Sequence, residues 1–232
     1  MARTRNAGNK NSLSAADRKE KLLACEKTKW AEGFSFVAGV DEAGRGCMAG
    51  PVVAAALIFT DETKIPEGID DSKKLTHEKR MFLREQLLAE KSIYWGVGVV
   101  SPEEIDQINI LQATWKAMRL AVEALKIKAD FILVDGNPVK GLPCPSLNII
   151  KGDSSSLSIG AASILAKTHR DLLMEEAARL YPQYGFEIHK GYCTELHIAA
   201  VREHGPCPIH RLTFEPVKSI LNPPECIQPE LF

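Results

Sequence analysis

The sequence predicts an α/β fold built on a central mixed sheet, and two observations support this prediction. Three apolar runs of extended type follow one another early in the chain, linked largely without helices, and later runs alternate with helical patterns. Because crossovers between parallel strands are right-handed, the first and fourth strands are candidates for parallel neighbours. At 232 residues the chain can bury one core, as a single domain or as a domain with an appendage.

The composition predicts a cytoplasmic protein. The formal net charge is -1, so any binding of nucleic acid must come from a local basic patch rather than from a global field. The six cysteines are scattered without a CxxC pair, which is typical of reduced thiols. The sequence shows no apolar N-terminal segment of signal-peptide type and no run of transmembrane length, so we expect no membrane partner.

The first 30 residues are interpreted as a basic arm that is partly disordered. They hold eight Lys and Arg against three Asp and Glu, and the early part is rich in Asn, Gly and Ser. A short helix fits residues 15–30. A solvated tail is the simplest interpretation of the arm, and weak attraction to phosphate is the alternative.

Five short runs rich in Val, Ile and aromatic residues predict strands. Pro51 opens the second run, a position that a strand tolerates, and Gly136 stops the fourth. The predicted strands cover residues 36–40, 52–59, 92–100, 130–135 and 147–150.

Capping residues and apolar spacing predict the helices. Thr76 caps a helix that runs to about residue 90, and Ser101 with Pro102 opens another. A further helix should cover about 110–125, and the longest should run from the serines at 154–156 to about 181, with small residues at 160–163 that suggest close approach to another backbone. A short helix is expected near 195–204. In the 110–125 helix, the residues expected to share one buried face are Leu111, Trp115, Met118, Val122 and Leu125.

Acidic residues recur where the predicted strands end. Asp41 and Glu42 follow the first strand, Asp135 ends the fourth, and Asp153 lies just past the fifth. Parallel strands place their carboxyl ends at one edge of the sheet, where α/β folds form ligand crevices. Four acids at one place need cations, and ligands that are all oxygen suit Mg²⁺ or Mn²⁺. Two such ions can activate water for phosphodiester cleavage. The alternative is that these acids are unrelated loop residues.

Seven segments, taken together and in order, resemble bacterial ribonuclease HII. The resemblance covers roughly residues 36–220. The segments are Asp41-Glu42-Ala43-Gly44-Arg45-Gly46, Asp71-Ser72-Lys73, Val134-Asp135-Gly136, Lys151-Gly152-Asp153, Ala161-Ala162-Ser163-Ile164-Leu165-Ala166-Lys167, Lys190-Gly191-Tyr192 and Pro208-Ile209-His210-Arg211.

The resemblance implies a ribonuclease H-like fold with a five-stranded mixed sheet flanked by helices and a small C-terminal helical extension. It implies an endonuclease that cuts the RNA strand of RNA–DNA hybrids and nicks 5′ to single ribonucleotides in duplex DNA, in support of ribonucleotide and RNA primer removal. The corresponding parts are a catalytic domain over 31–182, a substrate-contacting extension over 183–222 and an irregular tail over 223–232. Its four active-site carboxylates, which would hold Mg²⁺ or Mn²⁺, are Asp41, Glu42, Asp135 and Asp153.

The resemblance also implies how the substrate is held. The backbone of Gly44, Arg45 and Gly46 is expected to sense the ribose 2′-hydroxyl, a group that separates RNA from DNA, and Tyr192 to pack against the neighbouring deoxyribose. The candidate phosphate contacts are Lys73, Lys167 and Lys190. The expected partners are RNA–DNA hybrid and ribonucleotide-containing duplex DNA. We expect a monomer, and residues 229–232 are a place to look for a processivity-clamp contact.

Two positions near these motifs need comment. Cys193 follows Tyr192 where the resembled family more often has glycine or alanine, so we expect altered local packing rather than lost function. Asp171, beside Arg170, is expected to be structural or to support the site rather than to act in catalysis.

Three alternatives compete with this interpretation. Residues 44–49 fit a loose dinucleotide fingerprint, but a proline and a β-branched run follow where the motif needs a helix N-terminus. Cys193 with His197, and Cys207 with His210, could ligate zinc, although neither pair has a common finger spacing. A non-catalytic hybrid-binding module is the third alternative, and the acidic quartet disfavours it because free carboxylates repel phosphate.

Overall fold

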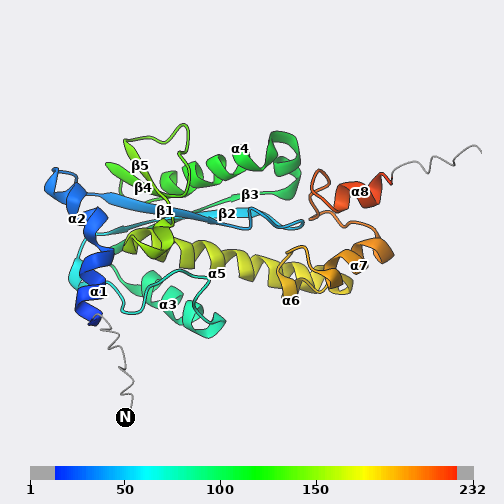
Figure 1. Cartoon of the computed structure of the whole chain (residues 1–232), viewed down its shortest axis with the longest axis horizontal. Coiled ribbons are helices and arrows are strands. Elements are labelled where there is room, and N and C mark those ends of the chain that lie inside the picture. Colours follow the sequence, from blue (N-terminus) through cyan, green and yellow to red (C-terminus); the bar gives the residue numbers. More distant parts are fainter. Residues whose placement is uncertain (1–13, 224–232) are drawn as a thin grey trace, which may run out of the picture.

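A five-stranded mixed sheet forms the centre of the computed structural model, which describes residues 14–223 (Figure 1). The strand order is β3-β2-β1-β4-β5. β1 pairs antiparallel with β2, and β2 with β3, whereas β1 pairs parallel with β4, and β4 with β5. The predicted mixed sheet and the parallel pairing of the first and fourth strands are confirmed. The bounds are β1 Val37–Ala43, β2 Val52–Phe59, β3 Ile93–Val100, β4 Phe131–Asp135 and β5 Ser146–Ile149.

Helices cover both faces of this sheet. α4 (Pro102–Glu123) lies on one face, and α5 (Leu157–Leu180) lies on the other together with α3 (His77–Ala89) (Figure 1). Each face has its own apolar core, because side chains alternate along the strands. Val40 and Ile132 pack towards α4, whereas Leu57 and the buried side of α3 pack towards α5.

β1 extends further than the sequence predicted. Its pairing with β2 continues to Ala43 opposite Val53, so Asp41 and Glu42 lie inside the strand rather than beyond its end. Consecutive strand residues point to opposite faces, so Asp41 shares the α5 face with Gly39, and Glu42 shares the α4 face with Val40. The two adjacent acids therefore leave the strand in different directions.

α4 begins at its predicted cap, and its buried face agrees with the predicted one only in part: Met118, Val122 and Leu125 are buried, as predicted. Ser101 Oγ accepts from the Glu104 amide at 3.2 Å, and a kink at Asn109 (φ 65, ψ 162) divides the helix. Leu111 is 39% exposed, so its predicted burial is wrong. The helix lies so close to β3 that a Cβ at Gly98 would stand 2.1 Å from the Ala117 carbonyl oxygen. Small residues therefore line the contact, and the buried residues of the helix are Ile105, Ala113, Thr114, Ala117, Met118, Ala121 and Val122.

α5 approaches β1 as closely as its small residues suggested. A Cβ at Gly39 would lie 2.2 Å from the carbonyl carbon of Ser158, so β1 and the first turn of α5 are in backbone contact. Ser156 caps the helix through the Ile159 amide at 3.3 Å. This contact holds the first turn of α5 beside the part of β1 that carries the acids.

The N-terminal segment is helical and packed over residues 15–31, as α1 (Ala15–Leu22) and α2 (Ala24–Ala31). Leu23 between them is fully buried, and so is Glu26, which accepts from Ser156 Oγ at 2.6 Å and from the Ser158 amide at 2.9 Å. A solvated tail is therefore wrong for these residues. The first 13 residues of the predicted arm lie outside the described residues.

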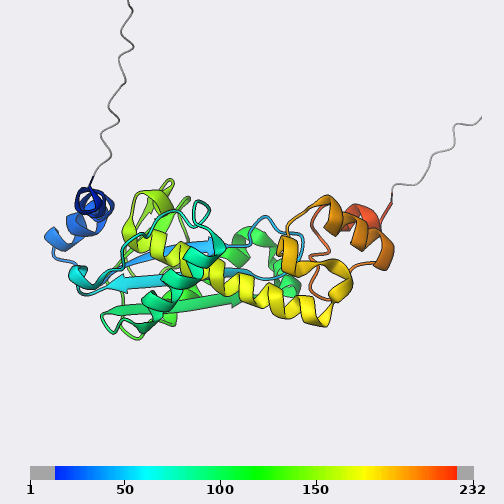
Figure 2. The same cartoon turned by 90° about the horizontal axis from the view of Figure 1, so that it is seen from below.

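The chain after α5 forms a small helical unit at the far end of that helix (Figures 1 and 2). Its helices are α6 (Phe186–His189), α7 (Glu195–His204) and α8 (Val217–Leu221). Phe186 and Val201 form its core with Met48, which comes from the loop after β1. Residues 224–232 lie outside the described range, so the predicted clamp contact is not part of the structure. Across residues 14–223, no helix is both long and apolar enough to cross a membrane.

Candidate active site

Three acids from different elements lie around the carboxyl end of β1. Val40 pairs with Val134, so the next residues along these parallel strands, Asp41 and Asp135, are neighbours. Asp153 lies in the short 3-10 helix Gly152–Ser154, which follows β5. The Gly152 amide donates to Asp135 Oδ1 at 2.6 Å and ties this turn to the end of β4. Asp41 and Asp153 are buried, whereas Asp135 is half-buried.

Glu42, next to Asp41 in the chain, lies on the α4 face of β1. Its amide donates to Asp41 Oδ1 at 2.7 Å, and Arg45 Nη1 lies 3.9 Å from its Oε1. Among the residues that the structure describes, no three His, Cys, Asp or Glu side chains are grouped closely enough to hold a metal ion.

Burial and repulsion between carboxylates raise the pKa of three of these acids, Asp41, Glu42 and Asp135. Burial raises the pKa of Asp41 well above its ordinary value, and the carboxylates of Glu42 and Asp135 raise it further. The pKa of Asp135 is raised by burial and by Asp153. Burial also raises the pKa of Glu42, although Arg45 opposes this shift. A group of acids that raise one another's pKa is poised to accept positive charge.

The cation nearest to this group is the ammonium of Lys73. Its Nζ lies 3.3 Å from Asp153 Oδ2, and its side chain is 80% exposed. Desolvation alone would lower the pKa of Lys73, but Asp153 and Asp41 outweigh it and the pKa is raised. A flexible ammonium therefore points at the buried acids. Because the donor set consists of oxygen atoms, the residues present fit a hard divalent cation such as Mg²⁺ or Mn²⁺.

The Gly44-Arg45-Gly46 turn contains two glycines with different structural reasons. Gly44 has φ +89, and a Cβ there would lie 2.0 Å from Arg170 Nε, so the fold itself requires glycine. A Cβ at Gly46 would meet nothing within 4 Å. Packing within the protein therefore explains why residue 44 is glycine. It does not explain why residue 46 is glycine, and the open space at Gly46 would admit a ligand.

Tyr192 and its neighbouring lysines lie on the C-terminal side of this turn. Tyr192 is 45% exposed, and Lys167 Nζ lies 5.6 Å from its ring centroid. Lys167 also pairs with the buried Asp171 at 2.6 Å, and Lys190 pairs with Glu175 at 2.7 Å. Asp171 thus fixes a lysine beside the tyrosine. Cys193 is exposed, so its extra volume meets no core.

Three buried histidines beneath Tyr192 were not predicted as a group. His197 Nδ1 lies 2.9 Å from the Tyr192 carbonyl oxygen, and its Nε2 lies 3.0 Å from His210 Nε2. His210 Nδ1 accepts from the Cys207 amide at 2.9 Å, and the His189 ring stacks on His197 at 4.2 Å. Burial lowers the pKa of both His197 and His210 to about 4. The only sequence signal was the short spacing of His197 from Cys193 and of His210 from Cys207, and it did not include His189.

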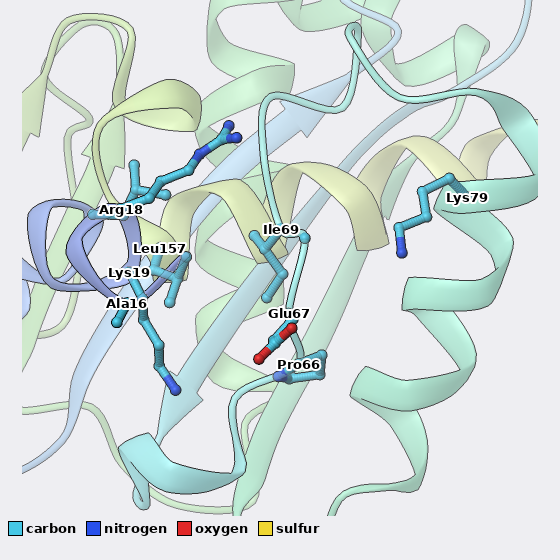
Figure 3. A pocket seen from close by; sticks show the side chains of 10 residues that line it. Ala16, Arg18, Lys19, Pro66, Glu67, Ile69, Lys79 and Leu157 are labelled. Carbon is cyan, nitrogen blue, oxygen red and sulfur yellow. The ribbon is translucent and has the colours of Figure 1, made fainter. Parts of the chain in front are cut away.

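A separate cavity of ≈ 630 Å³ lies away from the four carboxylates, none of which lines it. It is formed by α1, the segment 66–69, Lys79 of α3 and Leu157 at the start of α5 (Figure 3). Arg18 at its edge pairs with Asp70, three residues before Lys73. The cavity therefore borders the loop that carries Lys73 but contains none of the candidate catalytic groups.

A mixed sheet with carboxylates around the end of its central strand defines the ribonuclease H-like class of nucleases, and solved structures agree. Bst ribonuclease HIII in complex with Mn²⁺ superposes with a TM-score of 0.64 at 18% identity, over 90% of this chain and 73% of that one. Ribonuclease HII of Archaeoglobus fulgidus, solved in complex with PCNA, gives a TM-score of 0.65 at 26% identity, over 78% of this chain and 95% of that one.

The family model for Ribonuclease HII matches residues 38–217. Ribonuclease HII of Chlamydia pneumoniae is 50% identical over 210 residues, which cover 90% of this chain and 97% of that protein. The chain belongs to the ribonuclease HII family. It is a metal-dependent endoribonuclease that cleaves RNA in RNA–DNA hybrids and at ribonucleotides embedded in duplex DNA.

Proposed function

We propose that Asp41, Glu42, Asp135 and Asp153 are the catalytic carboxylates and that they hold Mg²⁺ or Mn²⁺. The observation that carries this proposal is the group of buried and half-buried acids at one sheet edge, where burial and neighbouring carboxylates raise the pKa of Asp41, Glu42 and Asp135. A divalent ion bound there supplies an activated water and stabilises charge on the phosphate oxygens. The Gly152 amide orients Asp135, and Lys73 is free to leave Asp153 for a substrate phosphate because it is exposed.

The substrate is proposed to lie across the Gly44–Gly46 turn and Tyr192. Gly46 leaves an open backbone that a ribose can approach, and the exposed Tyr192 ring offers a flat apolar surface to the next sugar. Lys73, Lys167 and Lys190 would contact phosphates, which positions a duplex without reading its sequence. The resemblance to the family implies cleavage 5′ to the ribonucleotide, leaving a 5′-phosphomonoester.

The first experiment tests cleavage of a duplex that carries one ribonucleotide. With Mg²⁺ or Mn²⁺ we expect one nick 5′ to that ribonucleotide, and with chelator we expect an intact strand, because no ion is then present to activate water. Product mapping on a sequencing gel identifies the cut. Cleavage that continues in chelator would exclude the metal site. Tight binding without cleavage in either metal would favour the non-catalytic hybrid-binding module.

A second experiment compares the two glycines of the turn. Gly46→Ala has room in the free protein, so we expect an unchanged melting temperature and a loss of cleavage of about tenfold or more if a sugar contacts this backbone. Gly44→Ala should lower the melting temperature as well, because its Cβ meets Arg170 and φ is positive. Wild-type cleavage by Gly46→Ala would remove this turn from the substrate site.

Other features of the setting also remain proposals. The relative from Archaeoglobus fulgidus was solved with PCNA, which supports a processivity clamp as a partner. The contact would use the C-terminal tail. A monomeric, cytoplasmic enzyme agrees with the composition, and light scattering of the purified protein would test the oligomeric state.

A further inference from the structure

Arg211 is a fully buried arginine that donates hydrogen bonds to the carbonyls of the Gly44-Arg45-Gly46 turn. Its Nη1 donates to the Arg45 carbonyl at 3.0 Å, its Nη2 to the Gly44 carbonyl at 2.7 Å, and its Nε to the Gly50 carbonyl at 3.0 Å. These acceptors are main-chain oxygens rather than carboxylates. The planar, multidonor guanidinium is the side chain best suited to hold several carbonyls at once.

Arg170 binds the other side of the same loop and is also fully buried. It donates to the carbonyls of Pro51, Ala49 and Lys190, at 3.0, 3.0 and 2.8 Å. One side chain of α5 thus joins the loop after β1 to the segment that leads into Tyr192. Main-chain bonds reinforce the junction, because the Met48 amide donates to the Gly191 carbonyl at 3.1 Å and the Gly50 amide to the Ile209 carbonyl at 2.8 Å.

The direction of these carbonyls fixes the direction of the neighbouring amides. In a trans peptide the C=O of one residue and the N–H of the next point in opposite directions. Because the Gly44 and Arg45 carbonyls point at Arg211, the N–H groups of Arg45 and Gly46 point away from it. Neither N–H has a hydrogen-bond partner within residues 14–223. Two adjacent unpaired donors thus lie in the turn beside the carboxylates.

We propose that Arg211, together with Arg170, is a positioning residue that aims the N–H groups of Arg45 and Gly46 at the 2′-hydroxyl of the ribonucleotide. The inference rests on the proposed role of this turn in ribose recognition, and it adds the two arginines that determine the orientation of the turn's N–H groups. It explains why two cations are buried without a carboxylate partner, which would otherwise be costly. The carbonyls that accept from the two guanidinium groups belong to the loop after β1 and to Lys190. The buried charges are therefore stabilised only while this loop keeps its conformation, and the loop keeps its conformation only while the arginines hold it.

The test compares Arg211→Lys with the wild-type protein. Lysine keeps the buried charge but cannot hold three carbonyls in one plane. Dissociation constants are measured in chelator, by fluorescence anisotropy, for a duplex with one ribonucleotide and for the same duplex made of DNA alone. We expect the preference for the ribonucleotide duplex to fall about tenfold, the size of one lost hydrogen bond, with unchanged affinity for the DNA duplex. Arg119→Lys is the matched control, because Arg119 lies on α4, is half-buried and donates to the remote Lys140 carbonyl.

An unchanged preference in a folded Arg211→Lys protein, or an equal loss of affinity for both duplexes, would overturn the positioning role. If the wild-type protein itself does not distinguish the two duplexes, ribose sensing by the turn fails, whatever the arginines do. If Arg211→Lys does not fold, Arg170→Lys is measured instead. We expect the same tenfold fall in preference, because this change weakens the hydrogen bonds that hold the same loop against α5. A preserved preference in that variant would equally overturn the inference.

Discussion

Asp135→Asn is expected to lower cleavage of a duplex with one ribonucleotide by about 10²–10³-fold, the usual effect of removing one group that stabilises charge in a transition state. Asn keeps the shape of the side chain and an oxygen that can accept from the Gly152 amide, so the turn that carries Asp153 should stay in place. What is lost is a negative charge that would hold a divalent cation. The effect should therefore fall on the rate rather than on the fold.

The melting temperature of the same variant provides a second test, because the direction of its change can be predicted. Burial and Asp153 raise the pKa of Asp135 above its unfolded value, so its ionised form opposes folding at neutral pH. Removing that charge should leave the melting temperature of the metal-free protein unchanged or higher. Asp130→Asn is the matched control, because Asp130 lies just before the same strand and accepts from the Ser35 and Phe36 amides at 2.7 and 2.9 Å. Cleavage by Asp135→Asn at the rate of Asp130→Asn would contradict the proposed site.

Local signals in the sequence were sufficient to place most elements. Thr76, Ser101 and Thr194 each precede a helix and accept from its first turn, because a short polar side chain satisfies amides that have no helical partner. The strands were recognisable because their residues are β-branched and apolar. The juxtaposition of Asp41 and Asp135 follows from parallel pairing, which the order of the elements implied.

Features that depend on distant contacts were not predictable in this way. Arg211 binds the Gly44 carbonyl across 167 residues, and Glu26 binds the Ser158 amide across 132 residues. The sequence around Arg211 or Glu26 does not predict such a distant partner. The burial of small α4 residues against β3 has the same origin, since glycines in β3 decide how closely that helix approaches. Packing between elements, rather than propensity within them, determines these features.

The buried histidines should make the C-terminal unit sensitive to acid, and their hydrogen bonds show why. His210 Nδ1 accepts from the Cys207 amide, so its proton is on Nε2 and is donated to His197 Nε2. His197 must then carry its own proton on Nδ1, which donates to the Tyr192 carbonyl. This chain of two neutral rings uses every ring nitrogen. A second proton on His197 would place its Nε2–H against the Nε2–H of His210, and one on His210 Nδ1 would replace the bond from the Cys207 amide by a longer contact of 3.3 Å with the Cys207 carbonyl.

We therefore expect the free energy of unfolding to fall as the pH drops from about 6.5 towards 4. The pKa of His197 and of His210 is about 4 in the folded protein and near 6.5 when unfolded, so their contribution is complete above 6.5 and is lost below it. On the order of 2 kcal/mol for each ring is at stake, at 1.36 kcal/mol per pKa unit with an allowance for residual solvent. Urea unfolding at pH 7.5 and pH 4.5 measures the change.

The comparison that isolates this effect uses His197→Gln, with His77→Gln as its control. Glutamine cannot take up a proton, so His197→Gln should lose less stability on acidification than the wild-type protein, even though it starts less stable. His77 is exposed on α3, and its replacement should leave the pH dependence unchanged. Carboxylates titrate over the same range in all three proteins, so only the differences between them report on the histidines. Equal losses in all three proteins would show that His197 is already able to accept a proton in the folded state.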